Sequence, residues 1–354
     1  MHESTRKSHG LLALTTAAMC FLAACGGEEV TASPASTTDA PTKASGTVIS
    51  YNTPKEWANY GEVLGAFSEE TGIQAPNDPK NSGQTLAALQ AEAGAPAADV
   101  AYYGITFGIQ AAEAGVVTAY EPERARDVPA ELKDADGNWI TVHTGTIAFL
   151  VNRSKLDGAP VPTSWADLLK PEYKGKVGYL DPTQAAVGYN VATAVNEALG
   201  GSLDDFGPGL EYLKKLKDNG AVTPAQTATA KVAQGEIPIL IDADFNGYKL
   251  KSEGAPVDVV IPEEGSIAIP YVVSLVDGSP NPPAGQALID FLLSEEGQAL
   301  FAAGFVRPVI GGYPDSVADK VNPASDYERA VAIDYAQQAK AQAGFIAEYK
   351  SSVR

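Results

Sequence analysis

Short apolar runs alternate with amphipathic stretches along most of the chain. Residues 47–51 (Thr-Val-Ile-Ser-Tyr) are rich in β-branched and aromatic side chains and predict a strand. The following Thr53 and Pro54 predict an N-cap and a first helical residue, and Glu56 supplies a carboxylate at the third helical position. Apolar side chains then recur at helical spacing until Gly72. A strand that leads into a capped helix is the repeating unit of an α/β protein.

The same alternation continues to the C-terminus. Apolar runs predict further strands at 99–104, 139–152, 176–180, 237–241, 258–261 and 267–275. Capping signals and helical spacing predict helices after Ser82, Ser164 and Asp181 and within 210–216, 284–305 and 333–349. After residue 46 we find no repeat, no heptad run and no apolar stretch long enough to span a bilayer. We therefore expect an α/β fold with a mainly parallel sheet.

The N-terminal residues have a different composition from the rest of the chain. The first ten include Arg6 and Lys7, and residues 11–24 are apolar and small. This apolar run is too short to cross a membrane as a helix, but it has the order of a basic, an apolar and a small-residue region that is typical of an export signal. We interpret residues 1–24 as a signal peptide.

The end of this segment, Leu22-Ala23-Ala24-Cys25, resembles the bacterial lipobox. The resemblance implies cleavage before Cys25 and a diacylglycerol on its sulfur, as in a palmitate-bearing lipoprotein. The alternative is an ordinary signal peptide with an incidental cysteine. Residues 25–46 are mostly Gly, Ser, Thr, Ala and Pro and are expected to form a lipid anchor and a flexible linker.

Charge and residue counts narrow the possible functions. The 354 residues include 25 Lys and Arg against 44 Asp and Glu, a net charge of −19, so no basic excess exists for a phosphate backbone and a nucleic-acid partner is excluded. The chain has 2 Cys and 3 His, and removal of residues 1–24 leaves only Cys25 and His143. A disulfide, a free thiol nucleophile or a His-rich zinc site cannot be built from these. We expect no metal, no cofactor and no enzymatic activity.

Several segments, in order from about residue 47 to residue 310, resemble the bacterial extracellular solute-binding proteins. Residues 66–73 (Ala-Phe-Ser-Glu-Glu-Thr-Gly-Ile) are similar to a signature of that family. Further segments that are similar to the family lie at 164–169, 173–177, 254–257, 262–265 and 291–297. Together with the lipobox, they identify the chain as resembling a substrate-binding lipoprotein of an ABC importer. The branch that it resembles includes binders of iron, polyamines and phosphorylated compounds.

The resemblance implies a two-lobed periplasmic-binding-protein-like fold of type II, with two crossover strands between the lobes. Lobe 1 would comprise residues 47–145 plus 275–354, and lobe 2 residues 146–274. A small-molecule ligand would lie between the lobes, which close around it by a hinge motion and deliver it to the permease subunits of the importer. The protein is then expected to be a monomer, attached to the cell membrane by lipid on Cys25 and facing the extracellular or periplasmic side.

Residues of the cleft are expected where strands end and helices begin, because ligands of open α/β sheets lie beyond the carboxyl ends of the strands. Helix N-termini at these places offer N–H groups and a partial positive charge to a phosphate or carboxylate. The candidate ligand-binding residues are Tyr51, Asn52, Thr53, Ser82, Gly83, Gln84, Tyr102, Tyr103, Asp181, Thr183, Asp242, Asp244, Phe245 and Tyr271.

The class of ligand is less well defined than the fold. Ferric-iron binders of this branch carry adjacent tyrosines after a strand of lobe 2, where this chain has Phe245 and Asn246. Polyamine binders use tryptophans and an aspartate at places held here by Ala243, Ile269 and Tyr271. A small organic anion such as a phosphate or phosphonate ester is therefore favoured, and ferric iron or a polyamine is the alternative. A non-transport adhesin or scaffold lipoprotein is the alternative from another class.

Three other signals have ordinary structural explanations. Tyr102 and Tyr103 are neighbours on a strand, so their side chains point to opposite faces and at least one should be packed in the core. His143 is expected to be a hydrogen-bonded structural residue or a ligand contact near the hinge. Residues 134–139 begin like an EF-hand loop but have Trp139 where that loop requires glycine, so we expect a solvated turn there.

Overall fold

The structure is a computed structural model that describes residues 44–224 and 228–354. The predicted signal peptide, the lipidation site Cys25 and most of the predicted linker lie outside the described residues. Among the residues that are described, no helix is both long and apolar enough to cross a membrane.

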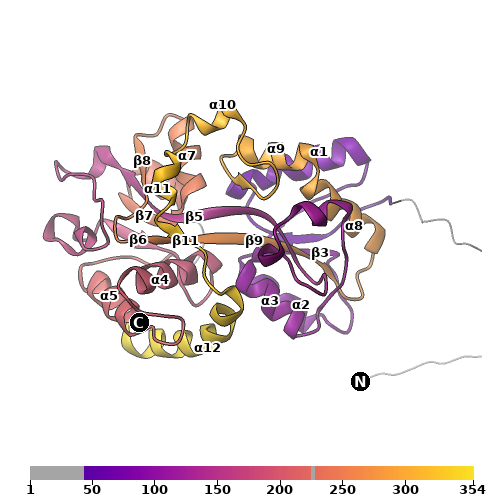
Figure 1. The fold of residues 1–354 in the computed structure, drawn as a ribbon, viewed down its shortest axis with the longest axis horizontal. Coiled ribbons are helices and arrows are strands. Elements are labelled where there is room, and N and C mark those ends of the chain that lie inside the picture. The colour runs from indigo at the N-terminus through magenta and orange to yellow at the C-terminus, as the bar shows by residue number, and fades with distance from the viewer. Residues whose placement is uncertain (1–43, 225–227) are drawn as a thin grey trace, which may run out of the picture. The chain divides into compact units, whose positions relative to one another are not determined.

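Two long strands organise the sheet. In the described part of the chain eleven strands form one sheet, whose main path has the order β2-β1-β3-β9-β5-β7-β6 (Figure 1). Strands β4, β8, β10 and β11 pair with β5 or β9 beside that path. The strands are β1 (Ser50–Asn52), β2 (Asn77–Pro79), β3 (Val100–Gly104), β4 (Val117–Thr118), β5 (Ile140–Asn152), β6 (Val177–Tyr179), β7 (Ile239–Ala243), β8 (Val257–Val260), β9 (Ser266–Val276), β10 (Arg307–Pro308) and β11 (Ala330–Val331).

Strands β5 and β9 connect two groups of parallel strands. On one side β1 pairs in parallel with β2 and β3, and on the other side β6 pairs in parallel with β7. Strand β5 pairs antiparallel with β9 along its first half and with β7 and β8 along its second half, whereas β9 also pairs with β3 and β4. The sequence-based expectation of two crossover strands is therefore confirmed.

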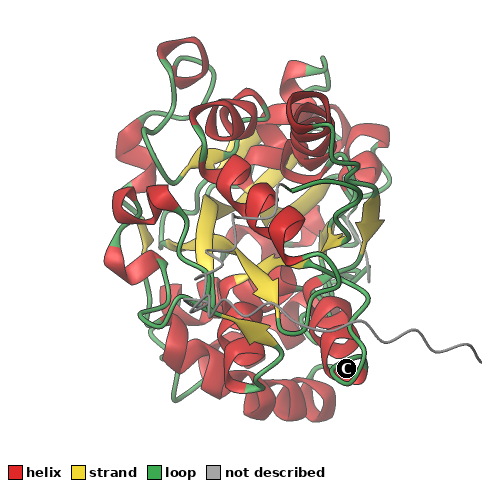
Figure 2. Cartoon of the chain, turned by 90° about the vertical axis from the view of Figure 1, so that its right-hand side faces the viewer, coloured by secondary structure: helices red, strands yellow, loops and turns green. Residues whose placement is uncertain are grey.

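Helices cover both faces of the sheet, which explains why its inner strands are apolar on both sides (Figures 1 and 2). All residues of β7 are buried, and in β5 Thr144 alone is partly exposed. The α-helices are α1 (Tyr60–Thr71), α2 (Ser82–Ala91), α3 (Ile105–Glu113), α4 (Ala186–Ala198), α5 (Gly207–Asp218), α6 (Thr229–Gln234), α7 (Asp244–Ser252), α8 (Pro282–Leu293), α9 (Glu295–Ala303), α10 (Asp315–Ala318), α11 (Ala324–Tyr327) and α12 (Tyr335–Ser352). The short 3-10 helices are η1 (Trp57–Asn59), η2 (Glu123–Asp127), η3 (Ala130–Leu132), η4 (Arg153–Lys155), η5 (Asp167–Leu169) and η6 (Pro171–Tyr173).

The first helix begins later than the sequence predicts. Instead of a helix capped by Thr53, the chain forms η1, and α1 starts only at Tyr60. Within η1, Ala58 and Asn59 have left-handed backbone angles, with φ of 51° and 58°. The side-chain amide of Asn59 donates to the Leu300 carbonyl oxygen at 2.8 Å, which holds this bend against α9. The prediction of an N-cap at Thr53 was wrong because a tertiary contact bends the chain before a regular helix can form.

The C-terminal helix α12 contacts elements from both predicted lobes. The Phe345 ring packs against the rings of Tyr189 on α4 and Phe206 before α5, with centroids 5.1 and 5.0 Å away. The amide of Gln110 on α3 donates to the Ala339 carbonyl oxygen at 3.2 Å. The lobe boundaries, including the assignment of 275–354 to lobe 1, therefore stay a prediction.

Candidate ligand site

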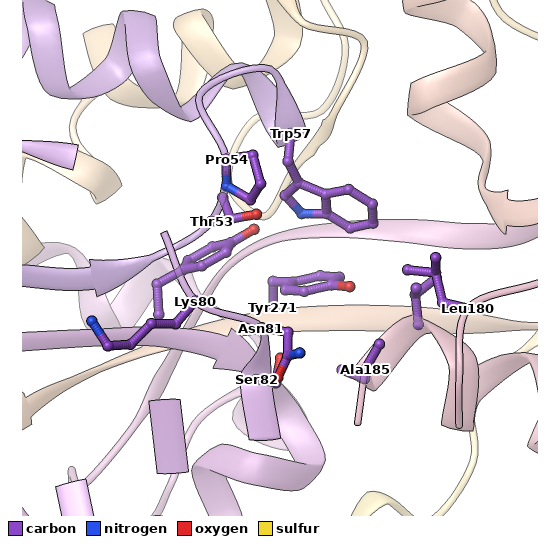
Figure 3. Close-up of a pocket in the computed structure, with 12 residues that line it drawn as sticks. Thr53, Pro54, Trp57, Lys80, Asn81, Ser82, Leu180, Ala185 and Tyr271 are labelled. Carbon is purple, nitrogen blue, oxygen red and sulfur yellow. The ribbon is translucent and has the colours of Figure 1, made fainter. Parts of the chain in front are cut away.

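A small cavity lies where the carboxyl ends of strands from both predicted lobes meet (Figure 3). Its volume is about 50 Å³, whereas pockets that hold drug-sized ligands usually measure about 300–1,000 Å³. Its lining residues come from the β1–η1 segment, the start of α2, β3, the segment between β6 and α4, and β9. They are Thr53, Pro54, Trp57, Lys80, Asn81, Ser82, Tyr102, Leu180, Ala185, Ala186, Val187 and Tyr271.

One wall of the cavity consists of polar groups at the N-terminus of α2. Asn81 caps this helix: its Oδ1 accepts the backbone N–H of Gln84 at 2.9 Å, and the Gln84 side chain accepts the N–H of Asn81. Because Oδ1 is occupied, the Nδ2 donor is the free end of the amide, and this buried atom has no partner among the described residues. The Ser82 hydroxyl beside it accepts the Gly104 N–H at 3.2 Å. This wall offers donors and the positive end of a helix dipole.

The opposite wall is aromatic. The indole of Trp57 meets the Tyr271 ring edge-on, with centroids 5.8 Å apart, and Tyr271 lies almost parallel to Tyr102 at 5.5 Å. Figure 3 shows the Trp57 indole above the Tyr271 ring at the cavity. Ring faces of this kind attract an ammonium group as well as apolar carbon.

His143 supports the aromatic wall from beneath. Its ring stacks on Tyr271 with centroids 5.2 Å apart, and its Nε2 lies 2.6 Å from the Tyr102 hydroxyl. His143 is fully buried, and burial lowers the pKa of its imidazole to about 3, so the ring is neutral at neutral pH. It does not line the cavity, and its contacts fit the structural role, one of the two roles that the sequence left open.

The single basic residue among the lining residues is directed away from the cavity. The Lys80 ammonium pairs with Asp78 at 2.7 Å and lies 3.7 Å from the centroid of the Tyr51 ring. Figure 3 shows its side chain extending away from Trp57 and Tyr271. An anion in this cavity would therefore contact neutral hydrogen-bond donors and a helix N-terminus rather than a cationic side chain.

The two sides of the cleft touch each other around the cavity. The Gly83 N–H donates to the Gln184 carbonyl oxygen at 3.3 Å. A Cβ atom on Gly104 would lie only 2.6 Å from the Cβ atom of Ala186, so glycine is required for this approach. These contacts explain the small cavity, and they imply that a ligand enters only after the two sides separate.

The structure brings some of the predicted site residues together and places others elsewhere. Those that line the cavity are Thr53, Ser82, Tyr102 and Tyr271. The others do not line it, and some of them bond to distant segments, such as Tyr51 to Glu92 and Tyr103 to Ser274. These other residues are Tyr51, Asn52, Gly83, Gln84, Tyr103, Asp181, Thr183, Asp242, Asp244 and Phe245. Their roles in ligand binding stay predictions.

Two neighbouring carboxylates at the end of β7 differ in their surroundings. Asp244 is fully engaged, since one oxygen accepts the Thr146 N–H and the other accepts the Tyr327 hydroxyl, both at 2.9 Å. Asp242 uses only Oδ1, which accepts the Ala243 N–H at 2.6 Å and the Asn246 amide at 3.1 Å. Burial raises the pKa of Asp242 to about 7.

Sequence reasoning missed Trp57 and Asn81. The helical spacing of apolar residues before Gly72 includes Trp57 and gives no sign of a site, whereas in the structure left-handed residues follow Trp57 and its side chain lines the cavity. Asn81 had a usable signal, because Asn followed three residues later by Gln84 is a capping-box pattern. The apolar residues 185–187 on the other side carry no sequence signal of a site.

Known proteins resemble this chain over most of its length. Residues 95–340 match the family described as bacterial extracellular solute-binding protein. A Salmonella typhimurium protein named as a putative 2-aminoethylphosphonate-binding periplasmic protein is 31% identical over 279 residues, which cover 77% of each chain. The spermidine/putrescine-binding periplasmic protein of Escherichia coli is 30% identical over 151 residues, 42% of each chain.

Solved structures share the fold at lower identity. The periplasmic binding protein AfuA from Actinobacillus pleuropneumoniae, with fructose-6-phosphate bound, has a TM-score of 0.76 and 22% identity over 87% of this chain and 98% of its own. Iron-bound HitA from Pseudomonas aeruginosa has a TM-score of 0.69 and 23% identity over 86% of this chain and 99% of its own. These similarities confirm the predicted periplasmic-binding-protein-like fold.

Proposed function

The chain belongs to the family of bacterial extracellular solute-binding proteins, and from this premise we propose that its cleft captures a small aminoalkyl phosphonate. The family assignment confirms the resemblance found in the sequence motifs. It makes the chain a substrate-binding protein of the ABC-importer type, which binds a small solute and delivers it to permease subunits.

The observation that carries the proposal is that one wall of the cavity is polar and the other is aromatic. The Nδ2 of Asn81, which has no partner in the described ranges, suits the oxygens of a phosphonate, as do the Ser82 hydroxyl and the N-terminus of α2. The rings of Trp57 and Tyr271 suit a short carbon chain and an ammonium group. A molecule with an anionic group at one end and an amine at the other matches both walls.

Relatives support the same chemistry. The Salmonella protein that matches 77% of the chain is named for 2-aminoethylphosphonate, and the structurally similar AfuA binds a phosphorylated sugar. Ferric iron suits the cavity less well, because burial raises the pKa of the Tyr102 and Tyr271 hydroxyls well above the usual range and makes phenolate ligands costly. A polyamine is the second candidate, since the aromatic wall would accept it, but no carboxylate stands among the described lining residues to balance several amines.

Isothermal titration calorimetry with the purified protein tests the proposal. We expect 2-aminoethylphosphonate to bind with a Kd of about 1 μM or tighter, and spermidine and ferric citrate to bind at least about 100-fold more weakly. Replacement of Asn81 by Asp should abolish phosphonate binding, because it keeps the helix cap but sets a negative charge against the anion. Tight spermidine binding without phosphonate binding would contradict the proposal.

Several finer features belong to the same proposal. We expect the protein to bind its ligand without chemical reaction, to act as a monomer and to be held on the extracytoplasmic side of the membrane by lipid on Cys25. We also propose that the hinge motion separates lobes built around the β1–β3 and β6–β7 groups. Replacement of Cys25 by Ser should move the protein from the membrane fraction to the medium or periplasm, and retention in the membrane fraction would contradict the anchor.

A further inference from the structure

The carboxylate of Asp242 is buried beside the second-lobe wall of the cavity, by which we mean the lining residues Leu180 and 185–187 of predicted lobe 2. Strands β6 and β7 pair in parallel, and Tyr179, the last residue of β6, lies opposite Ile241. Leu180 and Asp242 follow these two residues and therefore lie at the same level of the two neighbouring segments. Leu180 lines the cavity, and Asp242 is fully buried directly next to it. Asp242 also lies close enough to Tyr271, another lining residue, for its charge to raise the pKa of the Tyr271 hydroxyl.

One oxygen of this carboxylate makes no hydrogen bond to any residue that the structure describes. Oδ1 of Asp242 accepts from the Ala243 N–H and from the Asn246 amide, whereas Oδ2 has no hydrogen-bond partner in the described part of the chain. A buried acceptor without a partner costs about 1–3 kcal/mol, and proteins keep such groups mainly where another molecule or a water supplies the partner. The neighbouring Asp244 shows the contrast, because both of its oxygens accept hydrogen bonds.

We propose that Asp242 selects ligands that carry a cationic amine, by accepting an ammonium N–H at Oδ2 when the cleft closes around the ligand. This inference rests on the proposed function and adds the residue that distinguishes an aminoalkyl phosphonate from a simple phosphonate. The small present cavity must enlarge for any such ligand, and Leu180 and Tyr271 are the lining side chains whose movement would expose Asp242.

The charges around the cavity favour this arrangement. The first-lobe wall offers Asn81 Nδ2 and the N-terminus of α2 to an anion, and the second-lobe wall has Asp242 as its buried acceptor. A ligand with a phosphonate and an ammonium group would satisfy both walls at once. The pKa of Asp242, raised to about 7 by burial, means that an approaching cation can ionise this carboxyl near neutral pH.

The test compares two probes that differ only in the amine. Calorimetry should measure the affinities of 2-aminoethylphosphonate and ethylphosphonate for the wild type, for Asp242→Asn and for the smaller Asp242→Ser. The wild type should prefer the aminated probe by about 10- to 100-fold, the range expected for one charge-assisted hydrogen bond. Both variants should lose most of this preference, while their affinity for ethylphosphonate changes by less than about threefold.

A matched control removes another buried carboxylate. Asp99 is also buried, but its oxygens accept from Ile49, Ser279 and Asn281, and it does not line the cavity. Asp99→Asn should therefore retain the preference for the amine, and circular dichroism of each variant checks that it is folded. An unchanged preference in folded Asp242→Asn and Asp242→Ser would overturn the inference alone, whereas failure of the wild type to bind either probe would overturn it together with the proposed function.

Discussion

Single residues with unusual backbone angles shape the aromatic wall of the site. Ala58 is buried and has a φ of 51°, a region in which side chains with a branched Cβ atom are strongly disfavoured. Its position directly after Trp57 couples this bend to the direction of the indole ring. Strain held at such a place by surrounding contacts is common at ligand sites.

Replacement of Ala58 by Val should therefore lower both stability and affinity. We expect a loss of about 2 kcal/mol in the free energy of unfolding, because the branched side chain resists the left-handed conformation and the buried position has no space for it. Urea denaturation measures this loss. The matched control is Ala66→Val in the regular part of α1, which is partly exposed and should cost only a few tenths of a kcal/mol. Equal effects of the two replacements would show that the bend carries no strain.

His143 gives the protein a specific dependence on pH. Its pKa is lowered from 6.5 to about 3 in the folded state, so the unfolded chain binds a proton more readily between these values. The contribution of His143 to the free energy of unfolding is therefore fully present above about pH 6.5 and declines as the pH falls towards 3. The raised pKa of Asp242 acts in the opposite direction, since its contribution is lost as the pH rises through about 7.

Comparison with His143→Gln isolates the histidine, because Asp242 is present in both proteins. Between pH 7.5 and pH 5 the wild type should lose about 2 kcal/mol of unfolding free energy more than the variant, which is 1.5 pH units below the unfolded pKa multiplied by about 1.36 kcal/mol. Urea denaturation at the two pH values measures the difference. Parallel losses in both proteins would mean that the buried imidazole does not titrate as its surroundings imply.

At the scale of elements, the regular strands were predictable and the connections were not. The apolar runs at 139–152 and 267–275 correspond closely to β5 and β9, because strands covered on both faces must be apolar throughout. The segment between β6 and α4 was expected to be helical from Asp181, but α4 begins at Ala186. The Asp181 carboxylate instead accepts from the backbone and hydroxyl of Thr183. Local side-chain bonds of this kind compete with a helix, and their outcome depends on neighbours that are distant in sequence.

Only part of the candidate site could be predicted from the sequence, because side-chain directions depend on neighbours that are distant in sequence. Thr53, Ser82 and Tyr102 were found because they lie where strands end or helices begin, and Tyr271 was named from the family resemblance. All four line the cavity. Asp242 was also expected at a strand end, but its free oxygen could be recognised only once the partners of its neighbours were known. The rule of strand ends locates a cleft; it does not give the direction of each side chain.

The contact between Gly104, at the end of β3, and Ala186, at the start of α4, should set the equilibrium between the open and closed states of the cleft. Gly104→Ala places a Cβ atom about where Ala186 stands, at 2.6 Å, while the backbone φ of −64° suits alanine. We expect the folded protein to remain stable, but closure of the cleft should be disfavoured by about 1–3 kcal/mol, which weakens ligand affinity about 5- to 150-fold. Calorimetry with 2-aminoethylphosphonate measures this change. Gly94→Ala is the control, since a Cβ atom there meets nothing within 4 Å; a similar loss of affinity in both variants would contradict the role of this contact.

For the whole molecule, closure links the two walls of the site through one ligand. The cavity of about 50 Å³ is bounded by contacts between the sides of the cleft, so binding must begin in a more open state. A ligand that engages only Asn81 and the N-terminus of α2 would not gain contacts to the second-lobe wall. A ligand that also reaches Asp242 would gain them only in the closed state, and differential affinity is the sole means by which a ligand shifts such an equilibrium.

This reasoning predicts that the two probes differ in the closure that they cause, even when each saturates the protein. Small-angle X-ray scattering should show a smaller radius of gyration with 2-aminoethylphosphonate than with ethylphosphonate, because only the first holds both walls. At about 100 times its Kd the aminated probe should also add about 2.7 kcal/mol to the free energy of unfolding, measured by urea denaturation. The Asp242→Asn variant should respond to both probes as the wild type responds to ethylphosphonate. Equal compaction of the wild type by the two probes would mean that the phosphonate alone drives closure and that the carboxylate has no part in it.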